Sequence, residues 1–168
     1  MHDEILILLE DARGRDTIAA MPIDGASLVD LARSALIGEG FSQASISIVV
    51  VDNATIQDLN RRRLDHDWPT DVITFPLSEP DDAILEAEIV ISAEMAYETA
   101  KEFEFSPHAE LSLYLVHGLL HLCEYDDRTE SDAQEMRKRE GEVLEHVGIS
   151  NPFARVAPAG QGGVSWKV

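Results

Sequence analysis

The longest largely apolar segment near the middle of the chain extends from Leu111 to Leu122, within a stretch that has strong helix signals. Ser106 followed by Pro107 is typical of a helix start, because serine caps the first turn and proline fits its first position. The run is too short, and too often interrupted by polar residues, to span a membrane. We therefore expect a largely apolar helix, from about His108 to Cys123, within a folded domain.

Segments on both sides of this helix mix strand and helix patterns. Strands are expected near residues 5–9, 44–51, 71–75 and 87–91, and further helices near 26–37, 53–63, 92–103 and 129–147. The order lacks strict alternation, so the predicted class is α+β, with about four strands and about five helices. One domain is expected over residues 1–150, and the stretch 151–168 is predicted to be a poorly ordered tail.

The 168 residues carry a formal net charge of −19, and 45% of them are hydrophobic, which is enough to build a core. Strong acidity argues against a broad nucleic-acid-binding surface, because polyanion binding depends on Lys and Arg. The best local candidate for an RNA contact is the run Arg61, Arg62 and Arg63. The alternative is a solvated helix end, because cations near a helix C-terminus interact favourably with the helix dipole.

The N-terminus lacks a signal-peptide pattern, and the single cysteine, Cys123, excludes an internal disulfide. We expect a cytoplasmic protein without a membrane anchor.

Two histidines of the apolar helix form a candidate metal site. His117 and His121 are four residues apart, so both imidazoles lie on one helix face and can reach one ion at about 2.0–2.1 Å. Asp127 lies six residues after His121, beyond the expected helix end, and Asp126 is a rival third ligand. Three protein ligands would leave a fourth position open, as in catalytic zinc sites. The spacing is equally compatible with packed histidines and with an aspartate that only precedes the Thr129 cap.

The amino-acid sequences of several segments are more specific than the spacing of the candidate metal ligands. Residues 117–127, HGLLHLCEYDD, resemble the signature HGxLHLxGYDH of the YbeY family, and residues 70–76, TDVITFP, resemble its TDVLSFP segment. Leu59 and Asn60 followed by Asp67 resemble the entry to that segment, and residues 88–92 resemble its GDIVIS strand. The helix after the metal motif is also similar. Order and spacing agree from about residue 50 to 147, so the chain is identified as a member of this family.

The resemblance implies an α+β fold with a mixed sheet and a zincin-like metal helix in a cleft. It also implies a single-strand-specific, zinc-dependent endoribonuclease that matures the 3′ end of small-subunit ribosomal RNA and serves ribosome quality control. Its partners would be ribosomal RNA and ribosome assembly intermediates. A water activated at His117, His121 and Asp127, or the 2′-hydroxyl of the RNA, would attack the phosphodiester, and no side-chain base is assigned.

Three positions depart from the family pattern. Asp127 replaces the third histidine, which adds negative charge and weakens the pull of the ion on a phosphate. Glu124 replaces a glycine at the helix end, where a left-handed residue would cost glutamate about 1–2 kcal/mol. Leu64 stands where the family has an arginine, which leaves Arg63 as the nearest substitute.

Other residues have weaker functional interpretations. Asp71 and Thr74 are candidates for shaping an RNA groove, although turn and sheet hydrogen bonding explain them as well. Trp68 is a candidate for stacking on a base, and His66 for handling protons. A metallopeptidase is the main alternative, but such enzymes place a glutamate directly after the first histidine, where this chain has Gly118. A second alternative is a ribosome-associated binding module without turnover, and the acidity would suit a basic ribosomal-protein partner.

Overall fold

The computed structural model describes residues 4–64 and 70–152, and its centre is a four-stranded sheet. The strands lie in the order β1 (Glu4–Asp11), β2 (Gln43–Val51), β4 (Leu85–Ser92) and β3 (Val72–Pro76). The first three run parallel, whereas β3 pairs antiparallel with β4 at the edge. The sheet is therefore mixed, and the predicted α+β class is confirmed.

Six helices accompany the sheet in the described part of the chain: α1 (Arg15–Ala20), α2 (Gly25–Gly38), α3 (Asn53–Leu64), α4 (Ala93–Phe103), α5 (Pro107–Leu122) and α6 (Glu130–His146). The sequence predicted about five. The additional one is α1, between the predicted strand near residues 5–9 and the predicted helix near 26–37. It is only six residues long and buries no side chain, so it leaves no apolar periodicity to read.

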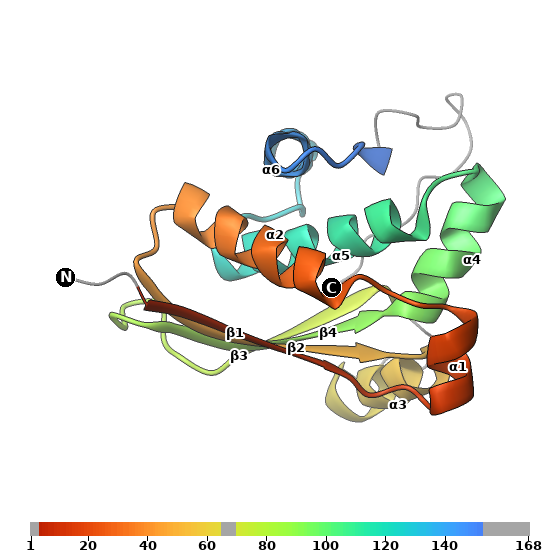
Figure 1. Cartoon of the computed structure of the whole chain (residues 1–168). Helices are drawn as coiled ribbons and strands as arrows, with labels where there is room; N and C mark the ends of the chain where they lie inside the picture. Colours follow the sequence, from red (N-terminus) through yellow and green to blue (C-terminus); the bar gives the residue numbers. More distant parts are fainter. Residues whose placement is uncertain (1–3, 65–69, 153–168) are drawn as a thin grey trace.

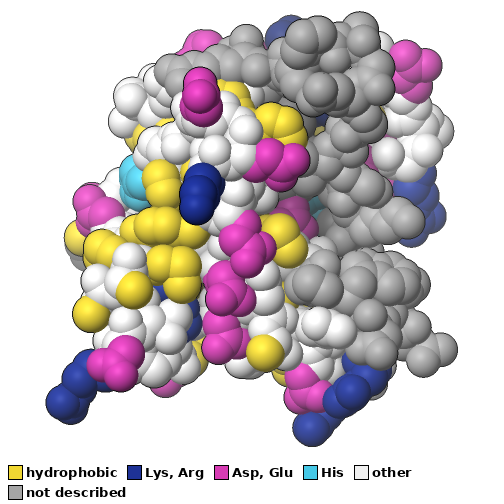
Figure 2. All heavy atoms as spheres, turned by 90° about the vertical axis from the view of Figure 1, so that its right-hand side faces the viewer, with side chains coloured by type: hydrophobic (Ala, Val, Ile, Leu, Met, Phe, Trp, Pro, Cys, Tyr) yellow, Lys and Arg dark blue, Asp and Glu magenta, His cyan; other side chains and the backbone are white. Residues whose placement is uncertain are grey.

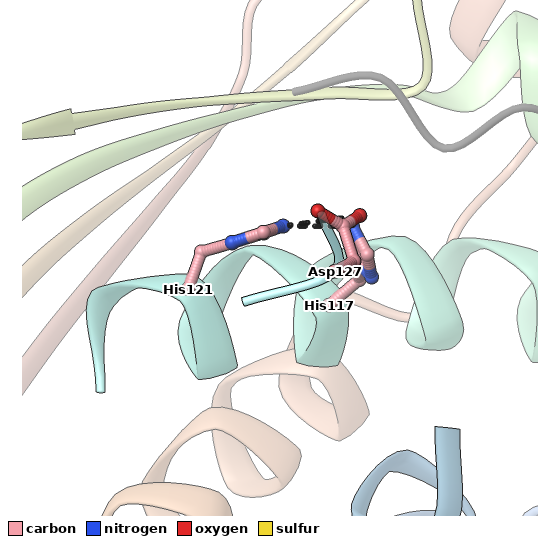
Figure 3. A group of neighbouring side chains, drawn as sticks. All are labelled: His117, His121 and Asp127. Atoms are coloured by element: carbon pink, nitrogen blue, oxygen red, sulfur yellow. Dashed lines mark hydrogen bonds and ion pairs between the residues drawn. The ribbon is translucent and has the colours of Figure 1, made fainter. Parts of the chain in front are cut away.

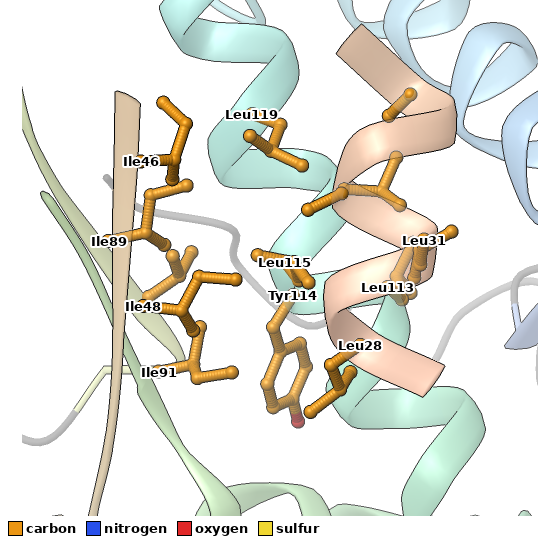
Figure 4. Packing of buried hydrophobic residues seen from close by; sticks show 14 of the residues in the cluster. Leu28, Leu31, Ile46, Ile48, Ile89, Ile91, Leu113, Tyr114, Leu115 and Leu119 are labelled. Carbon is orange, nitrogen blue, oxygen red and sulfur yellow. The ribbon is translucent and has the colours of Figure 1, made fainter. Parts of the chain in front are cut away.

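The helices cover the two faces of the sheet unequally (Figure 1). Helices α2, α5 and α6 lie on one face, where α2 packs on β1 and α5 beside it packs on β3 and β4, whereas α3 lies on the opposite face. In the core, Ile48 and Ile91 of the sheet face Leu115 and Tyr114 of α5 (Figure 4). Helix α5 is buried from Ala109 to Leu120, which explains why most of its residues are apolar.

Side-chain caps fix where the predicted helices begin. The hydroxyls of Ser92, Ser106 and Thr129 accept hydrogen bonds from backbone N–H groups at the start of α4, α5 and α6. The Asp52 carboxylate does the same for Thr55 in α3, at 2.8 Å. These local interactions satisfy N–H groups that have no partner within the helix, and they confirm the starts predicted from the sequence.

Helix α5 approaches the edge strand β3 closely at Gly118. A Cβ atom at this position would lie 3.0 Å from Val72 Cγ2 and 3.1 Å from Thr74 Cγ2. Glycine therefore permits the contact, and the contact holds His117 and His121 beside β3.

No helix in the described ranges is both long and apolar enough to cross a bilayer.

Some predictions concern residues outside this description. Asn151 packs against α6 at Gly141, but the remainder of the predicted tail, residues 153–168, lies outside the described residues. His66, Asp67 and Trp68 also lie outside them.

Candidate metal centre

The three predicted ligands converge on one point (Figure 3). The Nε2 atoms of His117 and His121 are 3.1 Å apart, and each lies 3.7 Å from Asp127 Oδ2. Donor atoms held at about 2.0–2.1 Å around a tetrahedral ion are about 3.3 Å from one another. The observed spacing therefore fits one divalent ion with very small side-chain movements.

The loop after α5 places Asp127, and not Asp126, beside the two histidines. The Asp126 side chain turns back and accepts a hydrogen bond from the Asp127 backbone N–H at 2.8 Å. Glu124 begins the loop with φ +72°, the left-handed conformation that the sequence predicted for this position. Next to it, the Tyr125 hydroxyl donates to Glu39 at the end of α2. Because Arg139 of α6 also binds Glu39, the loop is tied to two helices.

Glu140 supports the site from α6. Its Oε1 atom lies 2.8 Å from His117 Nδ1, and the residue is only 1% exposed. An ionised carboxylate there accepts the Nδ1 proton, which leaves the Nε2 lone pair directed at the ion. This role was not predicted from the sequence, although Glu140 carries a signal for it. Glu140 shares the buried face of α6 with Met136, Val143 and Leu144, and a charged residue on an apolar face requires a partner.

The second histidine is also suited to bind a cation. Burial, together with the nearby His117 ring, lowers the pKa of His121, although Asp127 partly opposes this effect. The neutral imidazole is the form that offers a lone pair to a metal.

Two buried acids lie deeper in the molecule. Burial raises the pKa of Asp71 to about 6 and that of Glu110 to about 7. Asp71 Oδ1 accepts hydrogen bonds from the Thr70 hydroxyl and the Val72 N–H. Asp71 is close enough to His117 to interact electrostatically, and Glu110 is hydrogen-bonded to Tyr114. Asp71 is thus buried, whereas Thr74 is partly exposed and lines a pocket that His121 also lines.

The arginine cluster is not brought into the metal centre. Helix α3, which carries it, lies on the sheet face opposite α5 (Figure 1). Arg61 and Arg62 form ion pairs with Asp58, and the Arg63 guanidinium lies 5.7 Å from the centre of the Phe75 ring. Phe75 packs against the small hydrophobic cluster that includes Ile56 of α3, whereas Thr74 faces α5. RNA bound at both places would have to cross the edge strand β3.

Comparisons with known proteins agree with this geometry. The family model described as Endoribonuclease YbeY matches residues 25–148. The chain belongs to the YbeY family. A relative named Endoribonuclease YbeY from Rhodopirellula baltica is 40% identical over 129 residues, which are 76% of this chain and 66% of that protein. A relative of the same name from Azorhizobium caulinodans is 32% identical over 157 residues, 90% of this chain and 96% of that protein.

A solved structure supports the YbeY-type fold as well. The solution structure of TM1509 from Thermotoga maritima is 26% identical to this chain, with a TM-score of 0.52. The similarity covers 94% of this chain and 99% of that one. The membership predicted from the sequence motifs is therefore confirmed, and the metal donors lie within the matched residues.

Proposed function

We propose that this YbeY-family protein is a zinc-dependent endoribonuclease that cleaves single-stranded RNA during ribosomal RNA processing. The convergence of His117, His121 and Asp127 in the matched part of the chain is the observation that carries the proposal. Relatives over most of the chain bear the name Endoribonuclease YbeY. Two imidazoles and a carboxylate, with a fourth position open, form the donor set of catalytic zinc sites.

The residues around the site have distinct roles in this proposal. His117, His121 and Asp127 hold the ion, and Glu140 orients the His117 ring. When bound, the ion supplies Lewis acidity at a phosphate oxygen and lowers the pKa of water. Thr74 borders the groove beside His121 and contacts the RNA backbone there.

The surface charge limits how RNA is held. On the face over α4 and α1, acidic side chains form a column beside a hydrophobic patch (Figure 2). Helix α4 carries Glu94, Glu98 and Glu102 four residues apart, which places them on one side of the helix. RNA therefore approaches from the side of β3, where Arg61, Arg62 and Arg63 contact the phosphates that lie beyond the strand edge. The acidic surface suits a basic ribosomal protein as partner during small-subunit 3′-end maturation and quality control in the cytoplasm.

The alternatives are less compatible with the structure. A metallopeptidase would need a glutamate at Gly118, where even a Cβ atom would lie 3.0 Å from Val72. A binding module without turnover would retain RNA affinity but would not need three converging metal donors. We also propose that residues 1–150 form the single domain that carries this activity and that residues 151–168 form its tail.

The test compares the wild type with Asp127→Ala on a single-stranded fragment of ribosomal RNA, on the same fragment in a duplex, and on casein. We expect zinc-dependent cleavage of the single strand only, abolished by a chelator, restored by added Zn²⁺ and absent in the variant. Metal analysis should give one ion per wild-type chain. Equal cleavage by both proteins in chelator would refute the metal role, and RNA binding without cleavage would favour the binding module.

A further inference from the structure

A pocket of about 470 Å³ lies directly beside the metal centre, and His121 forms part of its wall. Its volume is within the roughly 300–1,000 Å³ typical of pockets that hold small organic molecules. Phe41, Leu85 and Leu122 supply apolar wall, and all three also pack against the core. The pocket is therefore a preformed space at the place where a substrate bound to the ion would extend.

The charged groups of this pocket are all acidic. Glu79, Asp82 and Glu124 line it, whereas no lysine or arginine among the described residues does. The Asp82 carboxylate accepts a hydrogen bond from the Glu79 N–H at 2.8 Å, so it holds the turn between β3 and β4. The carboxylates of Glu79 and Glu124 have no hydrogen-bond or ion-pair partner in the described part of the chain. These two side chains are available to accept hydrogen bonds from a ligand.

Glu124 is held in an unfavourable backbone conformation. Its φ of +72° lies in the left-handed region, which disfavours residues with a Cβ atom. It occupies the helix end beside His121, where the family motif has glycine. A strained non-glycine residue at a site is reason to look for a function of its side chain.

The chemistry of the wall determines what can enter. Three carboxylates repel a phosphate, so the backbone of an RNA strand stays at the ion. The uncharged part of a nucleotide is its base, which an aromatic ring such as Phe41 can stack against. The next step rests on the proposed function, because it takes the substrate to be single-stranded RNA.

Carboxylates only accept hydrogen bonds, so they favour bases that present donors. Guanine presents two adjacent donors, N1–H and the N2 amino group, which match the two oxygens of one carboxylate. Uracil presents one donor between two carbonyl oxygens, which the carboxylates repel. We propose that this pocket receives the base next to the cleaved phosphate and that Glu124 makes it select guanine over uracil.

The test uses the full chain loaded with Zn²⁺ and single-stranded oligonucleotides that differ only in one base beside a single cleavable bond. Each of the four bases is placed in turn on the 5′ and the 3′ side. We expect kcat/KM to be about tenfold higher for guanine than for uracil at one of these positions. Glu124→Gln and Glu124→Gly should reduce this ratio to about one. Glu104→Gly is the matched control, because Glu104 is also left-handed, with φ +58°, but caps α4 away from the pocket.

A binding measurement separates this inference from the proposed function. In ¹H–¹⁵N spectra, guanosine should shift the amide signals of Phe41 and Leu122 in the wild type, and uridine should not. Cleavage of the four oligonucleotides of each series, 5′ and 3′, at equal rates would overturn base selection and leave the nuclease intact. Guanosine shifts without any cleavage would support the pocket and overturn the nuclease. Absence of both would overturn both.

Discussion

Replacing Glu140 by glutamine tests how far the metal centre depends on α6. The substitution keeps the size of the side chain but removes the charge that lies 2.8 Å from His117 Nδ1. Hydrogen bonds to charged groups contribute about 1.5–3 kcal/mol and neutral ones about 1 kcal/mol, so the loss is about 0.5–2 kcal/mol. Since about 1.4 kcal/mol is tenfold in affinity, the dissociation constant for Zn²⁺ should rise roughly 2- to 30-fold. The bound cation makes the Nδ1 proton more acidic, so the loss falls mainly on the metal-bound state.

Competition with a chromophoric chelator measures this affinity, and circular dichroism establishes that the variant is folded. Glu110→Gln is the matched control, because Glu110 is also a buried glutamate but contacts Tyr114 and no metal donor. Its zinc affinity should match that of the wild type, because no metal donor loses a hydrogen bond. If folded Glu140→Gln also bound zinc as tightly as the wild type, the carboxylate would have no part in the site.

Three further predictions concern stability and are measured by denaturant unfolding. Gly118→Ala should lower the free energy of unfolding by about 1–3 kcal/mol, because its Cβ atom would push α5 from β3; an unchanged value would contradict the close approach. Glu124→Gly and Glu104→Gly should each raise it by about 1 kcal/mol by removing a left-handed glutamate, and a loss at either position would contradict the strain. The folded-state pKa of Glu110 is raised to about 7, so the stability that its bound proton gives below pH 4.5 is lost as the pH rises through 7. Glu110→Gln should therefore match the wild type near pH 5 and exceed it by about 2 kcal/mol at pH 8, from about 1.4 kcal/mol per pKa unit; a constant difference would refute the assignment.

Local chemistry explains which features could be predicted from the sequence. The caps at Ser106 and Thr129 act within one helical turn, and His117 and His121 share a face whatever surrounds the helix. The role of Glu140 depends instead on how α6 packs against α5, 23 positions away. The separation of the arginines from the metal also depends on tertiary structure, because only the order of the strands decides which face α3 covers. Periodicity gives an element its buried face, but it does not say which element lies opposite.

The acidic character of the centre also determines how RNA binding responds to salt. The carboxylates of Asp127 and Glu140 would largely cancel the charge of a divalent cation held by the three donors, and the arginines lie across the sheet. Few phosphates are then neutralised, on the order of one or two. For single strands the logarithm of affinity falls with the logarithm of salt concentration with a slope of about −0.7 per neutralised phosphate, so we expect a slope near −1.

Fluorescence anisotropy of a labelled single strand between 50 and 300 mM KCl, roughly the range in which counterion release dominates nucleic-acid binding, would measure this slope. Arg63→Gln should make it shallower by about 0.7 if Arg63 contacts one phosphate. A slope steeper than about −3 would mean that at least four phosphates meet cations. The pocket beside His121 could not supply them, since its wall is acidic and includes no lysine or arginine within residues 4–64 and 70–152. Affinity would then come from the arginine side of the sheet, and the metal centre would act on a strand held elsewhere.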